Sequence, residues 1–78
     1  MIGYVLASNY RKKVLLALKE KAQTPNSISE KTGIYPTHVS TTLAQLSKMN
    51  IVVCLTPKLK KGKLYDLTKE GRTILSSL

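Results

Sequence analysis

The sequence predicts a mainly α-helical domain with one small β-hairpin, in the order ααα-ββ-α. Capping residues followed by apolar positions at helical spacing mark the helices, and short apolar segments at 51–55 and 64–67 mark the hairpin. At 78 residues the chain holds one small domain with a limited core. Its 42% hydrophobic and 22% charged residues are typical of a folded globule rather than a disordered tail.

The first helix is expected from Tyr10 to about Ala22, after an N-cap at Ser8 or Asn9. Residues 14–18 are apolar on every side of it, so we expect burial from more than one direction, with another subunit as a candidate for the second wall. Residues 1–7 form an apolar N-terminal extension that is also a candidate dimer contact. The basic first turn, residues 11–13, opposes the helix dipole and is expected to be a solvated face, with compensation by a phosphate or an acidic partner as the alternative.

Two further helices follow, separated by a short turn. Thr24 is expected to cap the first of them, and Pro25 stands at its first position, where the missing N–H costs nothing. Gly33 is placed for the left-handed residue that ends this helix. The next helix is predicted over residues 36–49, with Asn50 as its left-handed cap. Its inward stripe consists of Val39, Leu43 and Leu46.

The remaining residues predict a hairpin and a last helix. β-branched and apolar side chains at 51–55 favour a strand, and 64–67 favours a shorter one. The connecting loop, 57–63, has Gly62 near its return. Thr68 is expected to cap the last helix, in which four residues share one face: Gly71, Ile74, Leu75 and Leu78.

Charge is distributed unevenly along the chain. No acidic residue occurs between Glu30 and Asp66, and the net charge is +9. The lysines inside this interval are Lys31, Lys48, Lys58, Lys60, Lys61 and Lys63. Such a surface attracts a polyanion, and phosphates would relieve the repulsion among the lysines of the 57–63 loop. Lysines that protect the edge of a solvated hairpin are the alternative interpretation. The pattern favours nucleic acid, and duplex DNA in particular, as the partner.

In this order and spacing, the segments resemble the winged helix-turn-helix proteins. Residues 25–34 are similar to the first motif helix and turn of that family. Residues 36–46 resemble its recognition helix, in the V-S-x-x-L-x-x-L form common in MarR- and ArsR-type regulators. Residues 64–71 are similar to the Y-x-L-T-x-x-G segment that follows the wing. The resemblance covers roughly Tyr10 to Leu78, with small archaeal regulators as the nearest group, and it implies a DNA-binding domain over 8–78.

A recognition helix fits the major groove, where its outward residues meet base edges. The predicted base contacts are Thr37, His38, Thr41 and Gln45. Gln can pair with adenine and a Thr methyl can pack on thymine, so A·T-containing sites are favoured; a solvated polar face is the alternative. The predicted phosphate contacts are Tyr35, Ser40, Lys48, Lys58, Lys60, Lys61 and Lys63.

Three residues depart from the family pattern. Thr41 stands where many relatives have a base-reading Arg, which weighs against strong guanine recognition. Tyr35 replaces the usual Ser cap of the recognition helix, and Asn50 replaces the usual Gly. We therefore expect the cap of this helix to come from elsewhere or to be missing.

Other functions find less support in the residues. Four carboxylates, none paired with His or a nucleophile in a recognisable pattern, argue against an enzyme and give no catalytic residues. His38 and Cys54 are too few for a metal site, so we expect no metal and no cofactor. A single cysteine fits the reducing cytoplasm. No apolar run is long enough to span a membrane, and the N-terminus does not have the pattern of a signal peptide.

The leading hypothesis is a homodimeric, sequence-specific transcriptional regulator that binds double-stranded DNA. Its dimer contacts are expected from the first helix, the N-terminal segment and the last helix. The apolar candidates there are Ile2, Tyr4, Val5, Leu6, Ile74, Leu75 and Leu78. The second hypothesis is a winged-helix protein–protein interaction module of a larger assembly, which would bind an acidic partner. RNA binding ranks third, because four Tyr without Phe or Trp offer no stacking platform, and a membrane-surface role ranks last.

Overall fold

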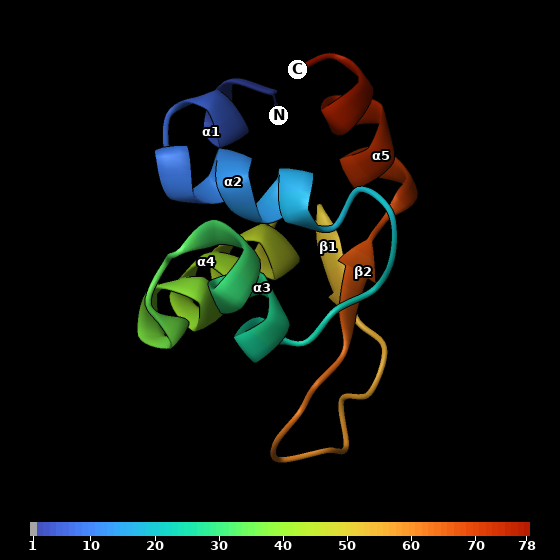
Figure 1. The fold of residues 1–78 in the computed structure, drawn as a ribbon. Coiled ribbons are helices and arrows are strands. Elements are labelled where there is room, and N and C mark those ends of the chain that lie inside the picture. Colours follow the sequence, from blue (N-terminus) through green and yellow to red (C-terminus); the bar gives the residue numbers. More distant parts are fainter. Residues whose placement is uncertain (1) are drawn as a thin grey trace.

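The computed structural model describes residues 2–78, and within them the predicted order of three helices, a hairpin and a final helix is confirmed (Figure 1). One short helix, α1, precedes these elements. The bounds are α1 Ile2–Leu6, α2 Asn9–Ala17, α3 Pro25–Thr32, α4 Pro36–Lys48, β1 Val52–Cys54, β2 Tyr65–Leu67 and α5 Lys69–Ser76. None of the helices in residues 2–78 combines the length and apolar character needed to cross a bilayer.

The N-terminal segment folds as a helix instead of trailing from the domain. Met1 lies outside the described residues, and α1 packs on α2 with Val5 fully buried. The expected burial of α2 from several sides is found at Val14, Leu15 and Leu18, whereas Leu16 is 48% exposed. One wall of α2, for which another subunit was a candidate, is therefore supplied by α1 of the same chain.

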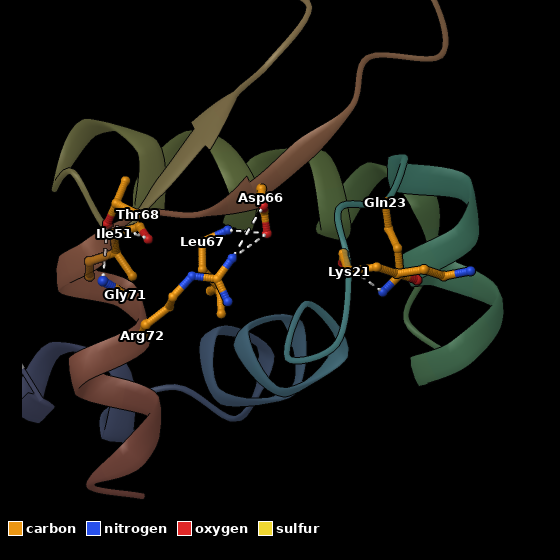
Figure 2. Close-up of polar contacts among 8 residues, drawn as sticks. All are labelled: Lys21, Gln23, Ile51, Asp66, Leu67, Thr68, Gly71 and Arg72. Carbon is orange, nitrogen blue, oxygen red and sulfur yellow. Dashed lines mark hydrogen bonds and ion pairs between the residues drawn. The ribbon is translucent and has the colours of Figure 1, made fainter.

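Helix α2 ends at Ala17, so the predicted end at about Ala22 was wrong. The chain must leave the helix because Gln23 pairs with Tyr65 of β2, through two backbone hydrogen bonds of 2.9 Å. The Gln23 side chain is buried and donates through Nε2 to the carbonyl of Ala17. It also donates to the carbonyl of Lys21, at 3.5 Å (Figure 2). The Gln23 amide thereby satisfies carbonyls at and beyond the end of α2.

Helices α3 and α4 begin and end largely as predicted. The Thr24 hydroxyl accepts from the N–H of Ser27 at 3.2 Å, and Gly33 has a φ of 75°. The inward stripe of α4 is fully buried, and Asn50 after it adopts the left-handed φ of 60°. The two helices pack on each other and on α2, which places α4 at the surface with one long outward face.

The hairpin is antiparallel, with Val52 opposite Leu67 and Cys54 opposite Tyr65. Helix α5 follows at once, and the Thr68 hydroxyl caps it by accepting from the N–H of Gly71 at 3.0 Å (Figure 2). The same hydroxyl lies 2.7 Å from the carbonyl oxygen of Asn50, so one side chain ties the start of α5 to the end of α4.

The core lies between α2, α4 and the hairpin, closed by α1 and α5. Its buried apolar residues are Val5, Val14, Leu15, Leu18, Ile28, Ile34, Val39, Leu43, Leu46, Ile51, Val52, Leu67 and Ile74. Figure 1 shows α1 and α5 at one end of the molecule, while the loop of the hairpin projects from the opposite end. Helices α3 and α4 lie in the half from which this loop projects.

Candidate nucleic-acid interface

The outward face of α4 carries short polar side chains. Thr37, His38, Ser40 and Thr41, together with Lys48, are all exposed. The Thr41 hydroxyl donates to the carbonyl of Thr37 at 3.1 Å, which leaves its lone pairs and its methyl group facing outward. Because the face carries one cation and no acid, it can approach a polyanion closely without repelling it.

The N-terminus of α4 is uncapped by side chains within the described residues, as expected from the Tyr35 substitution. The first N–H groups of a helix have no intrahelical acceptor, and they attract anions. Tyr35 is 75% exposed beside this end. The His38 ring lies 6.3 Å from that of Tyr35 and 5.3 Å from that of Tyr10, centroid to centroid. Aromatic side chains from α2 and the turn therefore border the start of α4.

Gln45 differs from the other predicted base contacts because another side chain holds it. It is half-buried on the flank of α4 that faces α2, and its Oε1 accepts from Nε of Arg11 at 3.3 Å. Nη1 of Arg11 donates to the carbonyl of Tyr4 at 3.0 Å, and the guanidinium carbon lies 3.9 Å from the Tyr4 ring centroid. The expectation of a solvated face at Arg11 was therefore wrong, and no sequence signal connects residues so far apart.

The loop 57–63, which we call the wing, displays its lysines to solvent. Lys58, Lys60 and Lys61 are exposed, while Lys63 is half-buried. The base of the wing is fixed by the Leu55 N–H, which donates to the carbonyl of Leu64 at 2.7 Å. Thr56 holds the other strand, because its hydroxyl accepts from the N–H of Leu64 at 2.9 Å. These hydrogen bonds give the lysines an ordered base.

Asp66, the acid that ends the lysine-rich interval, is engaged elsewhere. Its carboxylate lies 3.3 Å from Nη2 of Arg72 in α5, and its Oδ1 also accepts from the N–H of Leu67 at 2.8 Å (Figure 2). The partners of Asp66 are thus its own strand neighbour and an arginine of α5. The carboxylate therefore does little to neutralise the wing.

The wing and α4 are joined through residues that the sequence analysis did not identify as part of the site. Ile51 connects the end of α4 to β1, and its carbonyl oxygen accepts from the N–H of Thr68 at 3.0 Å and from the Thr68 hydroxyl at 2.9 Å. A capping Thr was predicted at position 68, but a cap signal does not reveal this second pair of hydrogen bonds. These hydrogen bonds fix the hairpin relative to the end of α4.

Large hydrophobic residues are also exposed on the other helices. Ile2 and Leu6 lie on α1, Leu16 lies on α2, and Leu78 follows α5. Leu16 and Leu78 line a hollow between α2 and α5, which the charged Lys19 and Arg72 also line. Val5 and Ile74, predicted as dimer contacts, are 0% and 7% exposed, so their assignment to an interface was wrong. They face the protein's own core because α1 and α5 both pack on α2.

Two residues with reactive side chains, Tyr65 and Cys54, lie opposite each other in the hairpin. Burial, followed by the neighbouring Cys54 thiol, raises the pKa of Tyr65 above its ordinary 10.0. Cys54 is half-buried on β1, and His38 lies on α4. Across residues 2–78, no three His, Cys, Asp or Glu side chains gather closely enough to hold a metal ion.

Comparison with known proteins gives a family and a fold. The family model described as "Bacterial regulatory protein, arsR family" matches residues 8–53. Similar solved structures include NMB1585, a MarR family regulator from Neisseria meningitidis, with a TM-score of 0.83 and 22% identity over 97% of this chain and 55% of that one. A mutant of ZitR from Lactococcus lactis has a TM-score of 0.77 and 21% identity over 90% and 49% of the two chains.

The homodimeric winged helix-turn-helix DNA-binding domain of Mb0332 from Mycobacterium bovis has a TM-score of 0.77 and 22% identity, over 97% of this chain and 68% of that one. The chain thus spans about half the length of the first two structures, and at these identities the likeness concerns the fold. A search among curated proteins finds no match.

The winged helix-turn-helix fold predicted from the sequence is confirmed, and so is the prediction that the chain is no enzyme, because the family consists of regulators. An archaeal source stays a prediction. Since the family model covers more than half of the residues, the chain belongs to the ArsR family of bacterial regulatory proteins.

Proposed function

We propose that this chain is a sequence-specific transcriptional regulator that binds duplex DNA, with α4 in the major groove and the wing on phosphates. One observation carries the proposal: the molecule has both an exposed α4 face without acidic residues and an exposed lysine loop. Hydrogen bonds between Thr68 and Ile51 join the hairpin that bears this loop to the end of α4. The Mb0332 domain, which shares the fold, is described as DNA-binding.

In this proposal, base recognition belongs to the N-terminal half of α4. Thr37 and Thr41 are one turn apart on its exposed face, and His38 is next to them. Their methyl, hydroxyl and imidazole groups are small enough to let the helix sit deep in the groove. Gln45 takes part through its amide, under the constraint of Arg11.

Backbone contacts would position the protein on the duplex without reading sequence. Tyr35 and Ser40 are exposed at the start of α4, where its free N–H groups also favour a phosphate. Lys48 is exposed at the end of the same helix. The wing adds Lys58, Lys60, Lys61 and Lys63 across the neighbouring groove.

The test is the salt dependence of duplex binding, measured by a shift assay at several salt concentrations. Replacing Lys58, Lys60 and Lys61 by Ala should lower the slope of log K against log salt by about 0.9 for each phosphate that the wing no longer binds. The matched control replaces the exposed Lys13, Lys19 and Lys21, which removes the same charge from outside the interface. Its slope should stay near that of the parent protein.

Equal slopes for the two variants would remove the wing from the mechanism. Failure of the parent protein to retain any duplex in dilute salt would overturn the proposal as a whole. That outcome would favour an interaction module whose +9 surface meets an acidic protein.

We further infer that the regulator acts as a homodimer, through the exposed apolar side chains of Ile2, Leu6, Leu16 and Leu78. A small domain gains stability by covering such side chains. Helices α1 and α5 lie at the end of the molecule away from the wing, so two copies could meet there without blocking DNA (Figure 1). The Mb0332 domain of the same fold is described as homodimeric.

Sedimentation of the free protein tests the dimer. Leu16→Glu should give a monomer, because a carboxylate would be buried without a partner in the proposed interface. Leu59→Glu is the matched control, since Leu59 is 49% exposed on the wing, against 48% for Leu16. A parent protein that sediments as a monomer at high concentration would contradict the inference.

A further inference from the structure

We propose that Arg11 is a specificity-determining residue: it fixes the amide of Gln45 with Nε2 outward, so that this side chain donates to hydrogen-bond acceptors on a base. The inference rests on the proposed function, because it assumes that α4 lies in the major groove. It is carried by the contacts among Arg11, Gln45 and Tyr4, in which Arg11 binds both α1 and α4.

The orientation of the Gln45 amide follows from the chemistry of its partner. A guanidinium has five N–H donors and no acceptor, so only the carbonyl oxygen of an amide can face it. The hydrogen bond of 3.3 Å between Nε of Arg11 and Oε1 of Gln45 therefore fixes which end of the amide points inward. Within residues 2–78, Nε2 of Gln45 makes no hydrogen bond. Every buried side-chain nitrogen and oxygen atom in these residues has a hydrogen-bond partner, so Nε2 of Gln45 must be exposed to solvent.

This orientation determines which bases Gln45 can recognise. Arg11 takes up one lone pair of the amide oxygen, and Nε2 is the group that Gln45 presents without a partner. Nε2 donates only, so it selects bases with acceptors in the major groove: O6 and N7 of guanine, O4 of thymine and N7 of adenine. Cytosine presents only its amino group there, so we expect Gln45 to select against cytosine at its position.

Arg11 can act in this way because it is itself held firmly. Its Nη1 donates to the carbonyl of Tyr4 at 3.0 Å, and its guanidinium carbon lies 3.9 Å from the Tyr4 ring centroid. An arginine fixed at two other points loses little further freedom when it binds Gln45. Lysine has one compact ammonium group, which cannot cover the ring and reach both oxygens with the same geometry.

The experiment selects bound fragments from a random duplex pool, using the full chain and four variants. Gln45→Ala identifies the base position that Gln45 reads, where we expect discrimination to fall roughly three- to tenfold, the value of one neutral hydrogen bond. Arg11→Lys keeps the charge and should flatten the same position while leaving the salt slope unchanged. Lys12→Arg is the control, because it makes the opposite exchange in the same helical turn. It should change neither the discrimination at the Gln45 position nor the salt slope.

Gln45→Glu provides a test that leaves Arg11 in place and does not depend on how well the Arg11 variant folds. A carboxylate paired with Arg11 has only acceptors left, so the selection against cytosine should be lost in favour of a base that presents an amino group, cytosine or adenine.

Arg11→Lys with unchanged discrimination at the Gln45 position would overturn the proposal. So would Gln45→Glu that still selects against cytosine, or Gln45→Ala that flattens no position. In each of these cases the parent protein still enriches a duplex sequence. No enrichment by the parent protein contradicts the proposed function instead, so the two failures are distinguishable.

Discussion

At Gly71, a single added carbon should disturb the contact between α5 and Ile51, and with it the link between the hairpin and α4. In α5 its Cβ would lie 2.2 Å from the carbonyl oxygen of Ile51 and 3.3 Å from the carbonyl carbon (Figure 2). Carbon and oxygen normally approach no closer than about 3.3 Å, so α5 and Ile51 must separate by roughly 1 Å. The oxygen that must move accepts both the N–H and the hydroxyl of Thr68.

The change in unfolding free energy for Gly71→Ala is the sum of two unfavourable contributions and one favourable contribution. Overpacking costs about 1–3 kcal/mol, and weakening the Thr68 hydrogen bonds adds about 1 kcal/mol. The higher helix propensity of Ala returns about 1 kcal/mol. We therefore expect unfolding free energy to fall by about 2 kcal/mol, which in a domain of this size lowers Tm by roughly 8–16 °C.

Thermal and urea unfolding followed by far-ultraviolet circular dichroism measure this change. Gly3→Ala in α1 is the matched control, because its Cβ would meet nothing within 4 Å. It should leave stability unchanged or raise it by up to about 1 kcal/mol. If Gly71→Ala were as stable as the parent protein, the close approach of α5 to Ile51 and the role assigned to it would be refuted.

Three more outcomes are expected. Gln23→Ala should lower the unfolding free energy by about 1–3 kcal/mol in urea titrations, because the buried Gln23 side chain is lost and the carbonyls of Ala17 and Lys21 lose their donor. Asn50→Gly should be neutral or stabilising, whereas Asn50→Val should cost about 1–2 kcal/mol at the φ of 60°; matching unfolding curves for both would contradict the left-handed cap. The raised pKa of Tyr65 favours its neutral form in the folded state, so its contribution to stability is complete below pH 10.0 and is lost as the pH rises through the folded pKa. Unfolding measured from neutral to alkaline pH should show this loss, and Tyr65→Phe should reduce it.

The order of elements could be predicted because the signals that carry it are local. Thr24, Gly33, Asn50 and Thr68 act within one helical turn of their own positions, and each was placed correctly from its neighbours in sequence. The inward stripe of α4 likewise follows from helical periodicity alone. The family resemblance added the expectation of a wing, which the hairpin confirms.

What the sequence by itself determined is the fold, the capping residues and the charge of the surface, since all three follow from residue type and short-range spacing. Tertiary packing decided the rest: that α2 ends at Ala17 because Gln23 must reach β2, that Val5 belongs to the core, and that Arg11 holds Gln45. These interactions join residues distant in sequence, and their energies depend on how the helices pack against one another. A local sequence pattern contains no information about that packing.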